Sequence, residues 1–152
     1  MRRKEKEISD KTAMESIILR SPVCRLALSE EGRPYIVPLC FGYKDNILYF
    51  HSAREGMKLD ILRRNNKVCI EVDIDHDIVE ADDACGWGMK YQSVIGFGKG
   101  SIIDDLEKKR KALDIIMQHY SGSSYEFPDS KLGKTVIIKV EIEHMTGKKS
   151  GY

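Results

Sequence analysis

Glycine occupies every second position in one long apolar run, at Gly96, Gly98 and Gly100 between Tyr91 and Ile103. A period of two is the side-chain period of a β-strand, so the three glycines would lie on one face of that strand. Glycine weakens a strand, but it lets another backbone, a second sheet or a ligand approach that face closely. The run therefore predicts a long strand with a closely approached glycine face.

Five other segments are typical of strands and three have helical spacing. The predicted strands are 23–29, 34–43, 46–52, 68–74 and 135–145, and the predicted helices are 11–20, 57–65 and 106–120. Short turn-forming segments separate the first three strands, which predicts an antiparallel meander. Helices do not follow each strand, which excludes a doubly wound parallel sheet. We expect one domain over residues 1–152, mainly β with flanking helices (α+β), built as a six-stranded antiparallel barrel.

Composition excludes several classes of protein. The 25 Lys and Arg residues nearly balance the 24 Asp and Glu residues, which argues against nucleic acid as a partner. No apolar run approaches the roughly 20 residues that span a bilayer, and no signal-peptide segment follows the charged start, so we expect a cytoplasmic protein without membrane contact. Cys24, Cys40 and Cys69 lie in apolar strand segments, which predicts reduced, buried thiols.

Two features of the sequence partly match metal-binding motifs, and each lacks required residues. Asp73, Asp75 and Asp77 resemble the start of a calcium-binding loop, but Ile78 and Ala84 stand where the loop needs glycine and glutamate. A solvated acidic segment is the expected alternative. The cysteines form no closely spaced pair of the kind that structural zinc uses. We therefore expect no metal.

One constellation is compatible with binding an anion. Tyr49, Phe50, His51 and Ser52 end a strand, and the segment up to Lys58 opens a helix. The Ser52 hydroxyl, the Lys58 ammonium and the free N–H groups of a helix N-terminus can together bind a phosphate. The alternative is a capped helix with Lys58 in solvent. The preceding strand carries Pro38 in its middle, so it is either an ordinary edge strand or lies against a flat aromatic ligand.

An ordered series of segments resembles the pyridoxamine 5'-phosphate oxidase-like flavoproteins. The series is 25–28, 32–41 and 48–52, and its continuation through 51–73, 91–98 and 107–113 resembles the nitroimidazole-resistance branch more narrowly. The likeness covers residues 10–145. Many sequences of that branch carry Arg where this chain has Gln92, and the chain has no basic C-terminal segment of the kind that binds the vitamin B6 phosphate.

The resemblance implies a fold and a cofactor site. It implies a split β-barrel homodimer with FMN at each subunit interface. The strand from Ile36 to Cys40 would face the isoalloxazine ring. His51, Ser52 and Lys58 would hold the phosphate or lie beside it. The cofactor-binding residues would be Ile36, Val37, Pro38, Leu39, Cys40, Phe50, His51, Ser52, Lys58, Trp87, Gln92 and Ser93. Gln92 and Ser93 would complete the site, within one chain or across the dimer, and Trp87 lies near the ring or only anchors its loop.

The implied function is an FMN-dependent oxidoreductase. It would take electrons from NAD(P)H or reduced flavin and reduce a small aromatic or nitro-type acceptor. His51 is the candidate catalytic residue, because an imidazole can supply a proton near neutral pH. Alternatively, His51 only bonds the phosphate or the backbone. The alternative function is a flavin-binding protein without turnover, for storage, sensing or electron transfer, and a barrel that holds haem is a third hypothesis.

Overall fold

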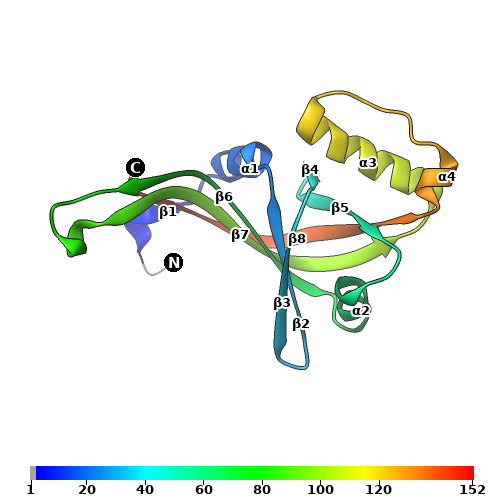
Figure 1. Ribbon diagram of the computed structural model, residues 1–152, viewed down its shortest axis with the longest axis horizontal. Helices are drawn as coiled ribbons and strands as arrows, with labels where there is room; N and C mark the ends of the chain where they lie inside the picture. The colour runs from blue at the N-terminus through cyan, green and yellow to red at the C-terminus, as the bar shows by residue number, and fades with distance from the viewer. Residues whose placement is uncertain (1–2) are drawn as a thin grey trace.

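The structure is a computed structural model that describes residues 3–152 (Figure 1). Within these residues, eight strands form a single antiparallel sheet. The strands are β1 (Glu7–Ile8), β2 (Cys24–Glu30), β3 (Arg33–Leu39), β4 (Gly42–Lys44), β5 (Ile47–Ala53), β6 (Lys67–Val79), β7 (Gly88–Ile103) and β8 (Thr135–Ser150). The helices are α1 (Lys11–Arg20), α2 (Met57–Arg64), α3 (Leu106–Ser121) and α4 (Asp129–Leu132), with 3₁₀ turns η1 (Lys4–Lys6) and η2 (Ala84–Gly86). The predicted mainly β fold with flanking helices is confirmed.

The strand order corrects the prediction of an antiparallel meander. The sheet runs β3-β2-β6-β7-β8-β5-β4, and β1 pairs with β8. The predicted strand 34–43 is two strands, β3 and β4, which lie at opposite edges of the sheet. Together with the short β1, this break makes eight strands instead of the predicted six.

The break between β3 and β4 shows how the sheet is curved. Only Cys40 and Phe41 join the two edge strands, and three Cα–Cα steps span at most roughly 11 Å. The sheet must therefore curl until its two edges approach each other, although no strand pairing closes it. Phe41 is completely buried, and its backbone N–H donates to the Tyr120 hydroxyl oxygen (3.0 Å) instead of to a strand. The result is a split, open barrel.

The glycine face of β7 is closely approached, as the period of two predicted. A Cβ on Gly98 would lie 2.0 Å from the backbone oxygen of Glu141 on β8. The register between β7 and β8 also shifts at this point, between Phe97 and Gly98. An irregularity of this kind bends the strands locally. Gly98 thus permits backbone contact at the bend that curls the sheet.

Aspartate side chains cap two of the three longer helices. The Asp10 side chain caps α1 and the Asp105 side chain caps α3, each by accepting a backbone N–H bond. In Figure 1, α3 lies against the curled part of the sheet near β4 and β5, and β6, β7 and β8 continue beyond it as a long arm. No helix within residues 3–152 is long and apolar enough to cross a membrane.

The predicted burial of three cysteines is confirmed for Cys24 alone. Cys24 is buried and Cys69 is half-buried, but Cys40 is exposed because it follows the break after β3. All four cysteines are free. Burial raises the pKa of the Cys24 thiol to about 12, so this thiol stays protonated at neutral pH.

Candidate functional site

The end of β5 presents one buried hydroxyl with no partner. Ser52 is 4% exposed, and its Oγ makes no hydrogen bond in the structure. Neighbouring side chains of a strand point to opposite faces, so Phe50 and Ser52 point into the core while His51 is exposed on the other face. The structure therefore separates His51 from Ser52, and their side chains cannot contact one small group together.

The helix that follows begins without a side-chain cap. Gly56 is the residue before α2, with φ +136°, and its carbonyl accepts bonds from the amides of Leu59 and Asp60 at 2.9 and 3.2 Å. Lys58 lies in the first turn and is half-buried. Ser52 and Lys58 thus lie on either side of the loop 54–56, between β5 and α2, as the sequence predicted.

A polar network that the sequence analysis missed holds this loop. Arg54 donates to both carboxylate oxygens of Asp104 and to the backbone oxygen of Gly133 (3.1 Å). Asp104 also accepts a bond from the buried Lys109 ammonium (2.9 Å). The bonds from Arg54 and Lys109 lower the pKa of Asp104 to about 2. The only sign of this network in the sequence was the Asp104-Asp105 pair. Asp105 caps α3, and Asp104 accepts the bonds from Arg54 and Lys109.

The predicted ring-binding strand lies at an exposed edge. β3 pairs only with β2, so its other edge is free of strand pairing, and Pro38 stands where a missing N–H costs no ladder bond. Ile36 and Pro38 are exposed, whereas Val37 and Leu39 are half-buried. The edge-strand interpretation of Pro38 is confirmed. A flat ligand against this backbone stays a prediction.

The residues opposite β3 continue its exposed face across the sheet. One cross-strand row consists of Ile36, Ala27, Cys69 and Phe97. Ile36 is 61% exposed and Phe97 is 53% exposed, and Ile95 is also exposed one row away. These apolar side chains form a broad surface on β3, β2, β6 and β7, which we call the outward sheet face.

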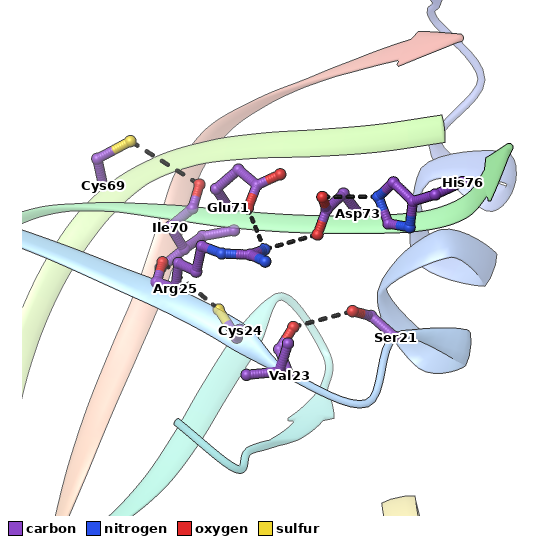
Figure 2. A network of polar contacts seen from close by, with 9 residues as sticks. All are labelled: Ser21, Val23, Cys24, Arg25, Cys69, Ile70, Glu71, Asp73 and His76. Carbon is purple, nitrogen blue, oxygen red and sulfur yellow. Dashed lines mark hydrogen bonds and ion pairs between the residues drawn. The ribbon is translucent and has the colours of Figure 1, made fainter. Parts of the chain in front are cut away.

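An ion-pair network lies in the middle of the outward sheet face (Figure 2). Arg25 on β2 donates to Glu71 (2.8 Å) and to Asp73 (2.6 Å) on β6. The other Asp73 oxygen lies 2.8 Å from His76 Nε2. Figure 2 shows Glu71 and Asp73 on either side of the Arg25 guanidinium. The Arg25 guanidinium thus binds two carboxylates.

The pKa values of the two carboxyl groups in the network are shifted in opposite directions. Burial and the Asp73 charge raise the pKa of Glu71 above its ordinary value, although Arg25 opposes them. Burial also acts to raise the pKa of Asp73, but the bonds from Arg25 and His76 outweigh it and lower that pKa. Asp73 was predicted to belong to a solvated acidic segment. The structure corrects this, because β6 runs to Val79 and carries Asp73 into the network.

The other predicted residues lie on the arm. Trp87 precedes β7, is half exposed, and donates from Nε1 to the backbone oxygen of Ala81 (2.8 Å). Gln92 donates to Asp75 (2.9 Å), and Ser93 pairs with Asp73 on the neighbouring strand. Ser93 therefore lies in the same cross-strand row as Asp73 of the ion-pair network.

The residues predicted to hold the phosphate and those predicted to complete the flavin site lie far apart in one chain. His51 pairs with Ile137, which pairs with Ile103 at the far end of β7. Gln92 lies eleven residues earlier on β7, which corresponds to roughly 35 Å of strand. Ser52 and Lys58 thus lie at one end of the sheet, and Gln92 and Ser93 at the other.

Three comparisons place the chain among known proteins. A family model described as pyridoxamine 5'-phosphate oxidase matches residues 10–149. The structure of a proposed 5-nitroimidazole antibiotic resistance protein from Bacteroides thetaiotaomicron VPI-5482 is 41% identical, with a TM-score of 0.84 over 94% of this chain and 86% of that chain. The FAD and heme binding protein from Mycobacterium smegmatis shares the fold at 20% identity, with a TM-score of 0.85 over 97% of this chain and 74% of that chain.

A curated relative matches over a shorter stretch. An uncharacterized protein from Rhizobium meliloti (strain 1021) is 33% identical over 58 residues. That match spans 38% of this chain and 38% of the relative's own length.

Proposed function

The chain belongs to the pyridoxamine 5'-phosphate oxidase family, and from this membership we propose that it is an FMN-dependent oxidoreductase. It takes electrons from NAD(P)H or reduced flavin and reduces a small aromatic or nitro-type acceptor. The name of the 41% identical neighbour, a proposed 5-nitroimidazole antibiotic resistance protein, supports the acceptor class. The names of two neighbours, an FAD and heme binding protein and an FAD-binding protein, support a flavin.

One observation carries the cofactor assignment, namely the unpartnered hydroxyl of Ser52. A buried polar group without a hydrogen bond is costly, typically about 1–3 kcal/mol, and therefore calls for a partner. This hydroxyl lies near the end of β5, five residues before Met57 at the uncapped start of α2, and Lys58 lies in the first turn. Ser52, Lys58 and this helix start are a donor set that fits the FMN phosphate.

The remaining residues fit the flavin ring and its chemistry. The unpaired edge of β3 offers backbone groups to the polar edge of a ring, beside the exposed Ile36 and Pro38. When bound, the isoalloxazine supplies the redox chemistry, and the protein binds and orients it. His51 is exposed and faces away from Ser52, so it is available to exchange a proton with solvent rather than to hold the phosphate.

The site is proposed to need two copies of the chain. Because Ser52 and Lys58 lie at the opposite end of the sheet from Gln92 and Ser93, one flavin can contact both groups only if they come from different subunits. The outward sheet face, with Ile36 and Phe97 more than half exposed, provides an apolar surface for a second copy.

We therefore expect a homodimer. Sedimentation of the FMN-loaded protein should give about twice the chain mass of 17.4 kDa. Replacing Phe97 with Glu should shift the protein toward the monomer and weaken FMN binding, since it places a charge in the apolar face. A matched control is Lys99→Glu, one row away on the same exposed face of β7. A wild-type monomer that binds FMN would refute the composite site.

The experiment that tests the function has two stages. The purified protein is titrated with FMN, and the loaded protein is then given NADH or NADPH with and without a nitroaromatic acceptor. We expect flavin uptake, and oxidation of the nicotinamide that depends on the acceptor. Flavin uptake without turnover would contradict the oxidoreductase and leave the alternative, a flavin-binding protein without turnover. Failure to take up FMN would contradict both functions.

The phosphate contact makes a sharper prediction for Lys58. Lys58→Ala removes one charge-assisted hydrogen bond, worth roughly 1.5–3 kcal/mol, so FMN affinity should fall about ten- to hundredfold. Riboflavin lacks the phosphate and should bind wild type and variant almost equally, as fluorescence titration can measure. The control is Lys67→Ala, an exposed lysine just beyond α2. Equal losses for FMN and riboflavin would contradict the assignment of Lys58 to the phosphate.

A further inference from the structure

A lysine-lined pocket lies on the opposite side of the sheet from the core, under α3. Its volume is about 380 Å³, which is within the range of small-molecule sites, roughly 300–1,000 Å³. None of the residues proposed to bind the flavin lines this pocket. It is therefore a separate feature of the fold.

Strand register explains the floor of this pocket. Tyr49 on β5, Lys139 on β8 and Ser101 on β7 form one cross-strand row, and Ile103 follows in the next row on the same face. These side chains point away from the core that contains Leu48 and Phe50. The floor is therefore apolar at Tyr49 and Ile103, with the short Ser101 leaving space between them.

Helical spacing explains the wall. Lys108, Lys111, Ala112 and Ile115 are three or four residues apart on α3, so they share one face of the helix. Ala112 and Ile115 face the sheet, with Ala112 buried in a small second core together with Ile137. Lys108 and Lys111 are exposed at the mouth. The pocket thus combines an apolar body with two lysines at its opening.

The charges of this pocket are unbalanced. Three of its eight lining residues are lysines and none of the eight is acidic. Lys139 forms an ion pair with Glu141, but within residues 3–152 neither Lys108 nor Lys111 takes part in an ion pair. The larger groove beside the 121–133 loop differs, because its Arg110 already donates to Phe127 and Asp129. The pocket under α3 therefore retains free cationic donors.

We propose that this pocket binds a nucleoside phosphate or a dinucleotide that contains one. The aromatic base packs against the Tyr49 ring and the aliphatic side chains, and the phosphate oxygens accept bonds from Lys108 and Lys111. Charge complementarity selects an anion, and the apolar floor selects one with a flat organic body rather than inorganic phosphate. The proposal is independent of the flavin, since it uses none of the flavin residues.

The test is calorimetric titration of the FMN-saturated protein with ADP. The protein is loaded with FMN and then freed of unbound FMN, which keeps the proposed flavin site occupied without offering a competing aromatic phosphate to the pocket. We expect ADP to bind, and adenosine and inorganic phosphate each to bind at least about tenfold more weakly. NADP⁺, which cannot reduce the flavin, distinguishes the two sources of the ligand when it replaces ADP, because tighter binding of NADP⁺ assigns the pocket to a dinucleotide. Absence of ADP binding at millimolar concentration, or equal binding of adenosine, would overturn the proposal.

Two variants separate the pocket from general surface charge. The double variant Lys108→Gln, Lys111→Gln should reduce ADP affinity at least about tenfold, and Ser101→Tyr should do the same by filling the floor while keeping the lysines. The matched control is Lys131→Gln with Lys134→Gln, a pair of exposed lysines outside the pocket. The thermal transition of each variant shows that it is folded. Unchanged affinity in both pocket variants would place the ADP elsewhere and contradict the assignment.

Discussion

Replacing Gly98 with alanine is expected to lower the free energy of unfolding by about 3 kcal/mol or more. A Cβ at this position would lie 2.0 Å from the Glu141 oxygen and 2.9 Å from the Glu141 carbonyl carbon. Both atoms belong to the backbone of β8, so no side chain can rotate away to relieve the contact. The strands must separate at the bend, where the register between β7 and β8 shifts.

Chemical denaturation with urea measures this effect. Gly88→Ala is the matched control, because the nearest atom to an added Cβ there is the Val79 Cβ at 4.0 Å. Gly88 also lies on β7, so both variants have the same change in intrinsic strand preference. We expect the control to change stability by less than about 1 kcal/mol. A loss of similar size in both variants would mean that the contact with β8 is not the cause.

The second large effect is expected for Lys109, which is charged and almost completely buried. Its side chain is 1% exposed, and its ammonium donates to Asp104 (2.9 Å) and to the backbone oxygens of Leu132 (2.8 Å) and Thr135 (2.9 Å). Lys109→Met keeps the length of the side chain but removes all three bonds. Two carbonyls then lose a donor, which typically costs about 1–3 kcal/mol for each buried group. For the two carbonyls together, we expect a loss of about 2–6 kcal/mol.

The neighbouring lysines of α3 supply the control for this prediction. Lys111→Met makes the same chemical change at an exposed position and should alter stability by less than about 0.5 kcal/mol. Asp104 keeps its bonds to Arg54 in the Lys109 variant, so most of the loss should come from the α4 and β8 carbonyls. A loss below about 1 kcal/mol for Lys109→Met would show that water replaces the ammonium there.

Periodicity and capping residues were sufficient to predict most of the helices and strands. The predicted helix 11–20 has the bounds of α1, and the predicted 106–120 differs from α3 by one residue. These segments have apolar residues at helical spacing, acidic residues that cap the helix start and residues that end the helix. All of these signals lie within a few residues of the helix, so no distant contact was needed to recognise them. The glycine period in β7 was also a local signal, and it predicted the close backbone approach that the structure shows.

The candidate site was less predictable, because its groups come from distant parts of the chain. Ser52 and Lys58 were found since they are six residues apart and flank a helix start. Arg25, Asp73 and His76 were missed, although they form one network, because β2 and β6 become neighbours only through the sheet order. The same holds for Arg54 and Asp104, which are separated by fifty residues. Nothing in their local sequence marks these ion pairs.

Local patterns along the chain were enough to predict the class of fold, the approximate positions of the helices and most strands, and the strand that must accept a close neighbour. These properties depend on interactions between residues a few positions apart, which a linear pattern records. The tertiary structure alone decided that β3 and β4 lie at opposite edges, that His51 and Ser52 face opposite sides, and that Ser52 and Gln92 lie far apart. Strand order depends on pairings between distant segments, and no local pattern specifies which of the possible pairings buries the most apolar surface.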